Sequence, residues 1–327
     1  MSAPMRSERA TRTQFSSQSL LTISARIAQH GLIAAECRSL TGGVPNSDGV
    51  SAATSIDLVG RAAFVQFGVR VLAEAASFEA LVEEVAVSHF DADRFRIDLH
   101  DPSERSAIGA TAAAIALADV IQFGPDLGDP QHRFLVIPGE DGWRFGEVVA
   151  VTDAGYRRHD EKPWTTSSSL DARFARGLVN LVPAARSILD PCCGAGSIVL
   201  EAASLGLHAF GVDWKPAMVG MTNENLAHFG YSAVVERADS REHRQRADAI
   251  VTDLPYGHAI DADEATIRGI LENCSELAPH AVFVAPADFS LWLRAAGYCD
   301  VDVVRVVKRR GFTRWIHTAE SEHFRSR

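Results

Sequence analysis

The stretch Ile188–Ala202 constrains the fold more than any other part of the 327-residue chain. It opens with a short apolar run that ends at Asp190 and continues through a tight turn containing Gly194 and Gly196. At Ser197 it passes into a segment with apolar residues at helical spacing. A strand, a glycine turn and a helix in this order are typical of a nucleotide-binding site at the carboxyl end of a parallel strand. Glycine has no Cβ, so a ligand can lie against the bare backbone of the turn while the amides of the helix face it.

The spacing within this turn differs from a dinucleotide-binding fingerprint. That fingerprint needs a third small residue three positions after the second glycine, where this chain has Val199. An acidic residue at the strand end suits a ligand with a cationic amino-acid end, because the Asp190 carboxylate can offset an ammonium or sulfonium charge but would repel a phosphate. The alternative is a plain turn between a strand and a helix.

From Trp164 onward, strand-like and helix-like segments alternate to the end of the chain. The predicted strands are 187–190, 208–212, 233–237, 249–252, 281–285, 301–308 and 311–318. Between them we predict helices, the first of which has Ser169 as its N-cap. This alternation predicts a parallel, doubly wound α/β sheet, and the turn at Arg309-Arg310-Gly311 predicts an antiparallel hairpin at its end. Such a sheet is the usual arrangement of the Rossmann-like, class I S-adenosylmethionine-dependent methyltransferase fold.

The first half of the chain has a different pattern, which predicts a smaller α+β domain over residues 19–151. We expect one helix over Leu20–Ser39 and, near the end of the domain, a hairpin that turns at Gly139–Gly142. The polar segment 1–18 is predicted to be a mobile tail. The charged segment 152–163 is predicted to link this domain to the methyltransferase domain, 164–327.

Composition limits the class of protein further. Apolar residues make up 46% and charged residues 23% of the chain, which is ordinary for a globular protein, and no apolar run predicts a membrane span. The five cysteines are odd in number and lack paired spacing, which favours reduced thiols in a cytoplasmic protein without a metal site. The formal net charge of −10 argues against a nucleic-acid binder, although a local basic face could still bind phosphates. Composition leaves the oligomeric state open.

Two further strand ends carry polar residues at the edge where ligands of such a sheet bind. Asp213 ends one predicted strand, where its carboxylate can accept hydrogen bonds from both ribose hydroxyls, and Trp214 beside it can stack on adenine. Asp239 and Ser240 follow the next strand, in a position to bind the amino edge of the adenine. A single acid at a strand end is usually a helix cap or a solvated residue. Three acids at successive strand ends, Asp190 included, favour a cofactor site.

The sequence Asp253-Leu254-Pro255-Tyr256 follows a fourth predicted strand and resembles the Asp/Asn-Pro-Pro-Tyr motif of amino methyltransferases. A planar amine with a delocalised lone pair is a poor nucleophile until acceptors hold its N–H bonds. The Asp253 carboxylate and the Leu254 carbonyl can both accept from one NH₂ group. Pro255 stiffens the turn, and Tyr256 can stack on a flipped base. A proline-containing β-turn with a buried Tyr256 is the alternative.

In combination these motifs resemble one known family. The segments Lys162–Trp164, Ser169–Leu181, Asp190–Gly196 and Asp253–Gly257 look like those of the THUMP-associated tRNA guanine-N2 methyltransferases. The resemblance covers about half of the chain, Lys162–Arg314. It implies S-adenosylmethionine as cofactor, guanine N2 as methyl acceptor, and an amino-terminal half that resembles a reduced ferredoxin-like and THUMP region and binds tRNA.

The resemblance also implies the site residues. The catalytic tetrapeptide would be Asp253, Leu254, Pro255 and Tyr256. The resemblance assigns Asp190, Gly194, Gly196, Asp213 and Asp239 to the cofactor. With the other candidates at these segments, the predicted cofactor-binding set also includes Ser169, Cys192, Trp214, Ser240 and Asp253. The clustering of basic residues in the linker and the last hairpin, and not the resemblance, predicts contacts to RNA phosphates, with a solvated basic turn as the alternative: Arg157, Arg158, Lys308, Arg309, Arg310 and Arg314.

Three hypotheses about function remain open at this stage. The first is methylation of a guanine exocyclic amine in RNA, with tRNA as the preferred substrate. The second keeps the chemistry but changes the acceptor to adenine N6, cytosine N4 or a protein side-chain amide. The third is a non-catalytic protein that only binds S-adenosylmethionine.

Overall fold

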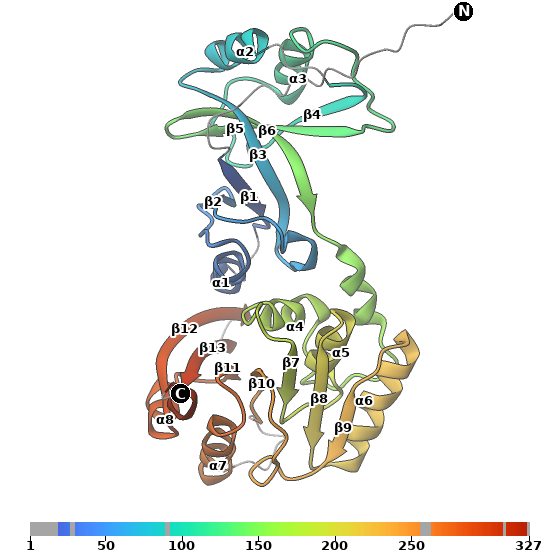
Figure 1. Ribbon diagram of the computed structural model, residues 1–327, viewed down its shortest axis with the longest axis vertical. Helices are drawn as coiled ribbons and strands as arrows, with labels where there is room; N and C mark the ends of the chain where they lie inside the picture. Colours follow the sequence, from blue (N-terminus) through green and yellow to red (C-terminus); the bar gives the residue numbers. More distant parts are fainter. Residues whose placement is uncertain (1–18, 27–29, 89–91, 256–262, 310–311, 326–327) are drawn as a thin grey trace, which may run out of the picture. The chain divides into compact units, whose positions relative to one another are not determined.

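The structure, a computed structural model, describes residues 19–26, 30–88, 92–255, 263–309 and 312–325. The predicted mobile tail, residues 1–18, lies outside this range. The chain divides into two compact units (Figure 1). One contains Val69–Val148 together with the start of the chain to Leu20, and the other contains Leu21–Gly68 and Val149–Arg327.

The first half of the chain contains a six-stranded mixed sheet with the strand order β2-β1-β3-β6-β5-β4. Its elements are β1 (Leu20–Ser24), α1 (His30–Thr41), β2 (Val50–Ala53), η1 (Val59–Arg61), β3 (Val65–Ala75), α2 (Phe78–Val87), β4 (Phe95–Leu99), α3 (Ala110–Ala118), β5 (His132–Gly139) and β6 (Gly142–Val151). The predicted hairpin is confirmed, since β5 and β6 pair antiparallel and Gly139 lies opposite Gly142. Gly142 has a φ of 129°, and a Cβ on it would lie 2.3 Å from the Ala75 carbonyl oxygen, so the turn requires glycine there.

The prediction of one helix over Leu20–Ser39 is wrong at its start. Leu20–Ser24 forms strand β1, whose residues are almost all buried between β2 and β3. The sequence pattern of a short apolar run is the same for a central strand and for a buried helix. In this chain the hydrogen-bonded pairing with β2 and β3 makes the segment a strand. The helix α1 begins only at His30.

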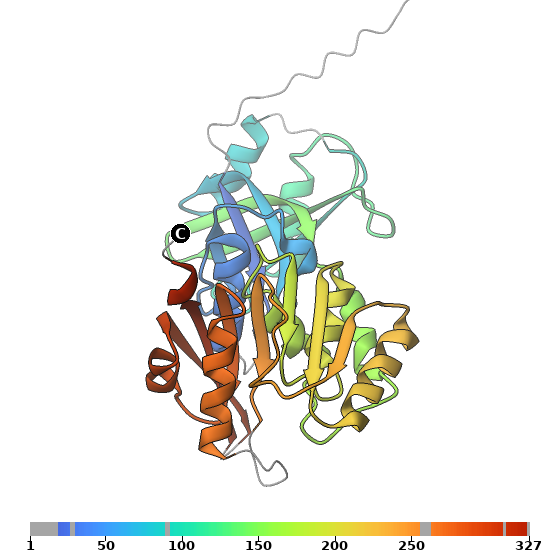
Figure 2. The same cartoon turned by 60° about the horizontal axis from the view of Figure 1, so that its bottom comes forward.

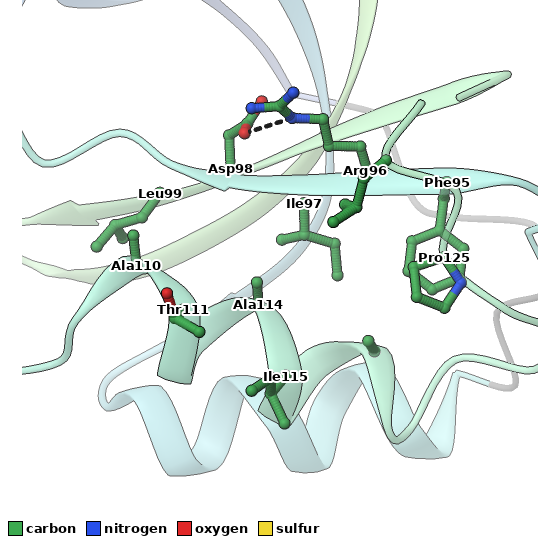
Figure 3. Close-up of a pocket in the computed structure, with 12 residues that line it drawn as sticks. Phe95, Arg96, Ile97, Asp98, Leu99, Ala110, Thr111, Ala114, Ile115 and Pro125 are labelled. Carbon is green, nitrogen blue, oxygen red and sulfur yellow. Dashed lines mark hydrogen bonds and ion pairs between the residues drawn. The ribbon is translucent and has the colours of Figure 1, made fainter. Parts of the chain in front are cut away.

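A cavity of about 470 Å³ lies between β4 and α3 in the first unit (Figure 3). Its walls are mostly apolar side chains, including Ile97 and Ile115, and Arg96 donates to Asp98 at 2.7 Å beside it. None of the residues that line the cavity is a predicted site residue. All of the predicted site residues, from Arg157 to Arg314, lie in the second unit.

The second unit contains a seven-stranded sheet with the order β12-β13-β11-β10-β7-β8-β9 (Figure 2). Its elements are η2 (Ala154–Glu161), α4 (Ala172–Val179), β7 (Ser187–Asp190), α5 (Ser197–Ser204), β8 (His208–Asp213), α6 (Pro216–Phe229), β9 (Val234–Arg237), β10 (Ala249–Asp253), α7 (Glu264–Ser275), β11 (His280–Ala285), α8 (Ser290–Ala295), β12 (Tyr298–Arg309), β13 (Phe312–Ser321) and η3 (Glu322–Phe324). The strands β7 to β11 pair in parallel, and β13 pairs antiparallel with both β11 and β12. The predicted doubly wound sheet with a terminal hairpin is confirmed.

Helices cover both faces of this sheet. One core cluster packs residues of α1, α4, α5 and α6 against the sheet, and the other packs residues of α7 and α8. Helix α4 begins two residues later than predicted. Its N-cap is Asp171, whose carboxylate accepts from the Phe174 amide at 2.8 Å, whereas the Ser169 hydroxyl accepts from the Thr166 amide at 2.9 Å. Ser169 therefore closes the loop before the helix instead of capping the helix itself.

Within the part of the chain that the structure describes, no helix is long and apolar enough to cross a membrane. The same residues contain no group of three or more His, Cys, Asp or Glu side chains that could hold a metal ion.

Candidate active site

The strand register brings three of the predicted carboxylates to one edge of the sheet. β7, β8 and β10 end at Asp190, Asp213 and Asp253, and all three strands run in parallel. Asp213 and Asp253 are near enough to Asp190 to act on its pKa. The sequence therefore placed these residues correctly at the carboxyl edge, where open α/β sheets bind ligands.

The glycine turn after β7 is built around two left-handed residues. Gly194 and Gly196 have φ angles of 53° and 82°, and the Gly196 amide donates to the Cys193 carbonyl at 2.8 Å. A Cβ on Gly196 would lie 2.5 Å from Cγ2 of Thr222, so no larger residue fits there. No described atom lies within 4 Å of a Cβ built on Gly194, so this part of the turn is open to a ligand.

Helix α6 supports this turn through two polar side chains that the sequence analysis missed. Thr222 donates from Oγ1 to the Gly194 carbonyl at 2.8 Å, and Asn225 donates from Nδ2 to the Ala195 carbonyl at 2.9 Å. Both side chains are buried, at 0% and 1% exposure. Thr222 and Asn225 are three residues apart, so they lie on the same face of α6, next to the buried Leu226. This spacing could have identified them as buried supports of the turn.

Asp190 lies beneath the turn. Its Oδ1 accepts from the Thr252 hydroxyl at 2.6 Å and from the Cys192 amide at 3.1 Å, and the residue is only 2% exposed. Burial raises the pKa of the Asp190 carboxyl to about 7, and the carboxylates of Asp253 and Asp213 act in the same direction. Asp190 thus fixes the turn from below through its hydrogen bond to the Cys192 amide. Burial also raises the pKa of the Cys192 thiol, which therefore stays protonated.

Asp213 holds the rim of the site. Its Oδ2 accepts from the Gly194 amide at 3.0 Å and its Oδ1 from the Lys215 amide at 2.8 Å, so the carboxylate ties the end of β8 to the glycine turn. Partial burial raises its pKa. Trp214 is 62% exposed, and Lys215 Nζ lies 5.1 Å from the centroid of its ring. An exposed indole at this rim offers a face for an aromatic ring to stack on.

Asp239 and Ser240, which follow β9, point in different directions. Arg241 donates from Nε to Asp239 at 2.9 Å and lowers the pKa of that carboxyl, which remains accessible. The Ser240 hydroxyl instead donates to the Pro191 carbonyl, and Asn273 donates to the Ser240 carbonyl at 2.9 Å. Ser240 therefore joins this loop to the glycine turn, and its hydroxyl is already engaged within the protein.

The tetrapeptide after β10 is described as far as Pro255. Asp253 pairs with Val284 of β11, and the Leu254 amide donates to the Val284 carbonyl at 3.0 Å. The Leu254 side chain is 2% exposed in the core, so it anchors the segment. Asp253 is half-buried and near enough to Asp190 to raise the pKa of that carboxyl. Tyr256 lies outside the described residues.

The predicted RNA-contacting arginines have different environments. Arg157 is exposed, whereas Arg158 donates to the Tyr231 hydroxyl at 2.6 Å. Arg314 is 4% exposed, with its guanidinium 4.9 Å from the ring centroid of Phe174. Its burial removes Arg314 from the candidate RNA surface, because Arg314 faces the core of the sheet and not the solvent. The side chains of Lys308 and Arg309, and the whole of Arg310, lie outside what the structure describes.

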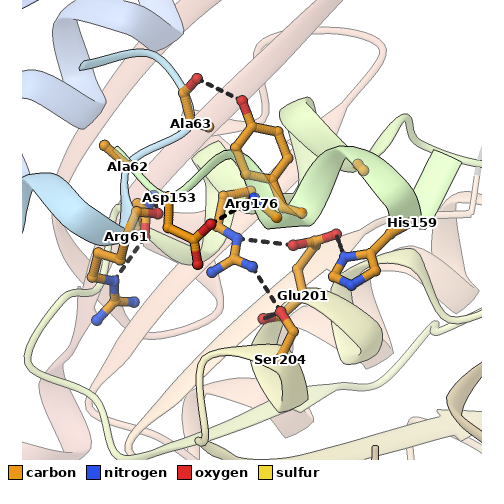
Figure 4. Close-up of polar contacts among 12 residues, drawn as sticks. Arg61, Ala62, Ala63, Asp153, His159, Arg176, Glu201 and Ser204 are labelled. Atoms are coloured by element: carbon orange, nitrogen blue, oxygen red, sulfur yellow. Dashed lines mark hydrogen bonds and ion pairs between the residues drawn. The ribbon is translucent and has the colours of Figure 1, made fainter. Parts of the chain in front are cut away.

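A buried charge network holds the segment 152–163, which was predicted only as a linker (Figure 4). His159 of η2 contacts Glu201 of α5 at 2.7 Å, and Arg176 of α4 donates to the second oxygen of Glu201 at 2.8 Å. Arg176 also donates to Ser204 at 2.7 Å. The side chains of His159, Glu201 and Arg176 are each less than 10% exposed, and burying such ionisable groups costs folding free energy unless they are paired. Their pairing therefore fixes η2 to the unit that contains the candidate site.

The residues of this edge fit S-adenosylmethionine. The open backbone at Gly194, the exposed Trp214 and the Asp213 carboxylate offer places for the amino-acid end, the adenine and the ribose. The strand order, with a glycine turn after its first strand and Asp-Leu-Pro after its fourth, is that of a class I S-adenosylmethionine-dependent methyltransferase. The predicted fold class is confirmed.

Comparison with known proteins gives the same class. Residues 158–280 match the family described as the UPF0020, RMKL-like methyltransferase domain. A tRNA (guanine(10)-N2)-dimethyltransferase from Pyrococcus abyssi is 30% identical over 178 residues, which cover 51% of this chain and 52% of the relative. A protein of the same name from Methanothermobacter thermautotrophicus is 43% identical over 115 residues, 34% of each chain. The predicted resemblance to tRNA guanine-N2 methyltransferases is confirmed, and the chain spans about half the length of these relatives, or less.

Among solved structures, TrmN from Thermus thermophilus aligns with a TM-score of 0.48 and 17% identity, over 93% of this chain and 99% of that chain. The family match, residues 158–280, lies in the unit that contains the candidate site.

Proposed function

We propose that this protein methylates the exocyclic N2 of a guanine in tRNA, with S-adenosylmethionine as the methyl donor. The observation that carries the proposal is the position of Asp253 and Leu254. They stand at the end of β10, beside Asp190 and the glycine turn, at the edge of a methyltransferase sheet. An amine held at this segment would face a cofactor bound at the turn.

The chain's own residues would hold the cofactor at three points. The backbone at Gly194, with Asp190 below it, would take the amino-acid end; Asp213 would accept from the ribose hydroxyls, and Trp214 would stack on the adenine. Asp239 remains a candidate for the adenine amino group. When bound, the cofactor supplies an electrophilic methyl group on a sulfonium.

The acceptor amine would be held by two oxygen atoms. The Asp253 carboxylate and the Leu254 carbonyl would accept its two N–H bonds, which concentrates the lone pair on nitrogen. Asp253 would then accept the proton that the nitrogen loses on methylation. Pro255 would fix the carbonyl of the preceding residue in place, and Tyr256, from the motif, would stack on the base. These roles need orientation within a few tenths of an ångström, which the buried Leu254 anchor supports.

The choice of tRNA rests on the relatives. Their names specify guanine 10 of tRNA and dimethylation, and we extend both features to this chain as part of the proposal. The α+β half would bind the tRNA, and basic residues of η2 and of the last hairpin would contact its phosphates: Arg157, Lys308, Arg309 and Arg310. Such an enzyme would act in the cytoplasm.

The proposal is tested by offering labelled S-adenosylmethionine together with total RNA, DNA or protein. We expect label in the RNA fraction only, and N2-methylguanosine or N2,N2-dimethylguanosine after digestion to nucleosides. Label in N6-methyladenosine, N4-methylcytidine or protein would assign a different acceptor. Cofactor binding without label in any fraction would contradict catalysis altogether.

A further inference from the structure

An arginine and a tryptophan lie together at the carboxyl edge, outside the set of residues considered so far. Arg305 of β12 pairs directly with Trp315 of β13, and its guanidinium lies 5.0 Å from the centroid of the indole ring. Arg305 is exposed and Trp315 is partly exposed. Within the described residues Arg305 forms no ion pair, so its charge is available to a ligand.

The strand register places this pair beside the proposed acceptor site. Trp315 pairs with Ala285, the last residue of β11, and the amide of Leu254 donates to Val284 one residue earlier. Leu254, Ala285 and Trp315 are therefore level with one another on the neighbouring strands β10, β11 and β13. Two strand spacings separate the acceptor tetrapeptide from the indole, roughly 10 Å. That distance suits a nucleotide next to the target guanine, but not the target itself.

The chemistry of the pair suits an RNA nucleotide. Unpaired bases stack on aromatic rings and on the planes of arginine guanidinium groups, and arginine N–H groups bind phosphate oxygens. Because Arg305 lies over the indole, the ring orders the guanidinium and leaves its outer face toward solvent. Opposite Trp315 stands Ala285, whose small side chain leaves room beside the ring.

We propose that Arg305 and Trp315 form a platform for the nucleotide that flanks the target guanine. The base stacks on the guanidinium, the guanidinium stacks on the indole, and the remaining N–H groups of Arg305 contact the phosphate. This inference rests on the proposed function and adds two positioning residues to it. The platform acts in RNA binding and touches neither the cofactor nor the reacting amine.

The same sheet supplies a matched control. Arg246 precedes β10 and lies over Phe324, 5.9 Å from its ring centroid, after the end of β13. This second cation–π pair also combines an exposed arginine with a partly exposed ring, but it stands at the opposite, amino edge of the sheet. Loss of either pair removes a similar interaction, and only one of them lies near the acceptor site.

The experiment compares steady-state methylation of tRNA by Arg305→Ala, Trp315→Ala, Arg246→Ala and the unmodified protein. We expect the first two variants to raise KM for tRNA about tenfold, the size of one base stacking interaction, with kcat and the Kd for S-adenosylmethionine within twofold. Arg246→Ala is expected to leave all three constants unchanged. Trp315→Phe should restore most of the affinity, and Arg305→Lys should not, because lysine has no plane to stack on.

This experiment distinguishes failure of the platform from failure of the proposed function. An unmodified protein that methylates tRNA, with Arg305→Ala at the same KM, would overturn the platform alone; Arg305 is exposed, so this variant creates no cavity that could unfold the chain. Equal KM increases in Arg305→Ala and Arg246→Ala would also overturn it. An unmodified protein that methylates no RNA would overturn the proposed function and the platform with it.

Discussion

The two halves of the carboxyl edge are built in different ways. On the cofactor side, around β7 and β8, almost every polar group of the turn has a partner within the protein: Thr222 and Asn225 hold its carbonyls, and Asp213 holds its Gly194 amide. On the acceptor side, around β10 and β11, the backbone is anchored by one amide and the buried side chain of Leu254.

This difference suggests that the cofactor side determines cofactor binding, whereas the acceptor side determines the rate of methyl transfer. A cofactor common to many reactions can be held by a rigid, pre-formed turn, whereas an acceptor base must enter from a large RNA and be positioned by a few exposed groups. We therefore expect substitutions on the cofactor side to change cofactor affinity and those on the acceptor side to change turnover. The following predictions test that separation, in order of decreasing effect.

Asp253→Ala should lower kcat for tRNA methylation by on the order of 1,000-fold, about 4 kcal/mol, because the amine loses its charged acceptor. The Kd for S-adenosylmethionine, measured by calorimetry, should change by less than about tenfold. Asp253→Asn keeps one acceptor oxygen and is expected to retain part of the activity. A kcat unchanged in Asp253→Ala would show that the acceptor side works without this carboxylate.

Gly196→Ala should weaken S-adenosylmethionine binding by about 50-fold or more, since the new Cβ would lie 2.5 Å from Thr222 Cγ2 at a φ of 82°. Gly220→Ala, two residues before Thr222 on α6, meets no described atom within 4 Å and serves as the control. That variant should bind normally and gain up to about 1 kcal/mol of stability. Equal effects of both substitutions would contradict a specific role for the turn.

Asp190→Asn should change how stability depends on pH. Burial keeps the pKa of Asp190 near 7 in the folded chain, while an unfolded aspartate has a pKa near 4. Between these values the folded state holds one more proton, so its free energy of unfolding falls as pH rises, by about 1.4 kcal/mol per pH unit from this residue. Chemical denaturation at pH 5 and pH 6.5 should show a shallower fall in Asp190→Asn. Parallel slopes in both proteins would mean that Asp190 is ionised in the folded state.

Thr222→Val should have the smallest effect. It removes the hydroxyl that donates to the Gly194 carbonyl and keeps the shape of the side chain, so we expect a loss of about 1 kcal/mol in stability and roughly fivefold in cofactor affinity. The kcat at saturating cofactor should stay the same. A fall in kcat with unchanged cofactor affinity would contradict the expectation that cofactor-side substitutions change affinity and not turnover.

The sequence predicted the cofactor side of the fold well because its signals are local. A strand end, two glycines and a helix stand within fifteen residues, and their backbone angles require glycine at Gly196 whatever surrounds it. The strands β7 and β8 were likewise placed within a residue of their observed bounds. Because the strands are parallel, the acids that end β7, β8 and β10 lie at the same edge of the sheet.

Other features depended on contacts that are distant in sequence. Residues of β1 were predicted as helix, because only its pairing with β2 and β3 decides the conformation. Ser240 and Arg314 looked available for ligands in the sequence, but the fold turns one toward Pro191 and the other onto Phe174.

The linker was missed as a structural element for the same reason. His159 stands 42 positions from Glu201 in the sequence, and only the folded chain brings them within hydrogen-bond distance.

The measurement that tests the central claim most directly uses tRNA in which inosine replaces guanosine at the methylated position. Inosine differs by the loss of the exocyclic N2 amine, so it leaves Asp253 and Leu254 nothing to hold. We predict normal methylation of the guanosine tRNA, no methyl transfer to the inosine tRNA, and binding of the two RNAs within a few-fold of each other. Methyl transfer to the inosine tRNA at an undiminished rate would contradict the assignment of the acceptor.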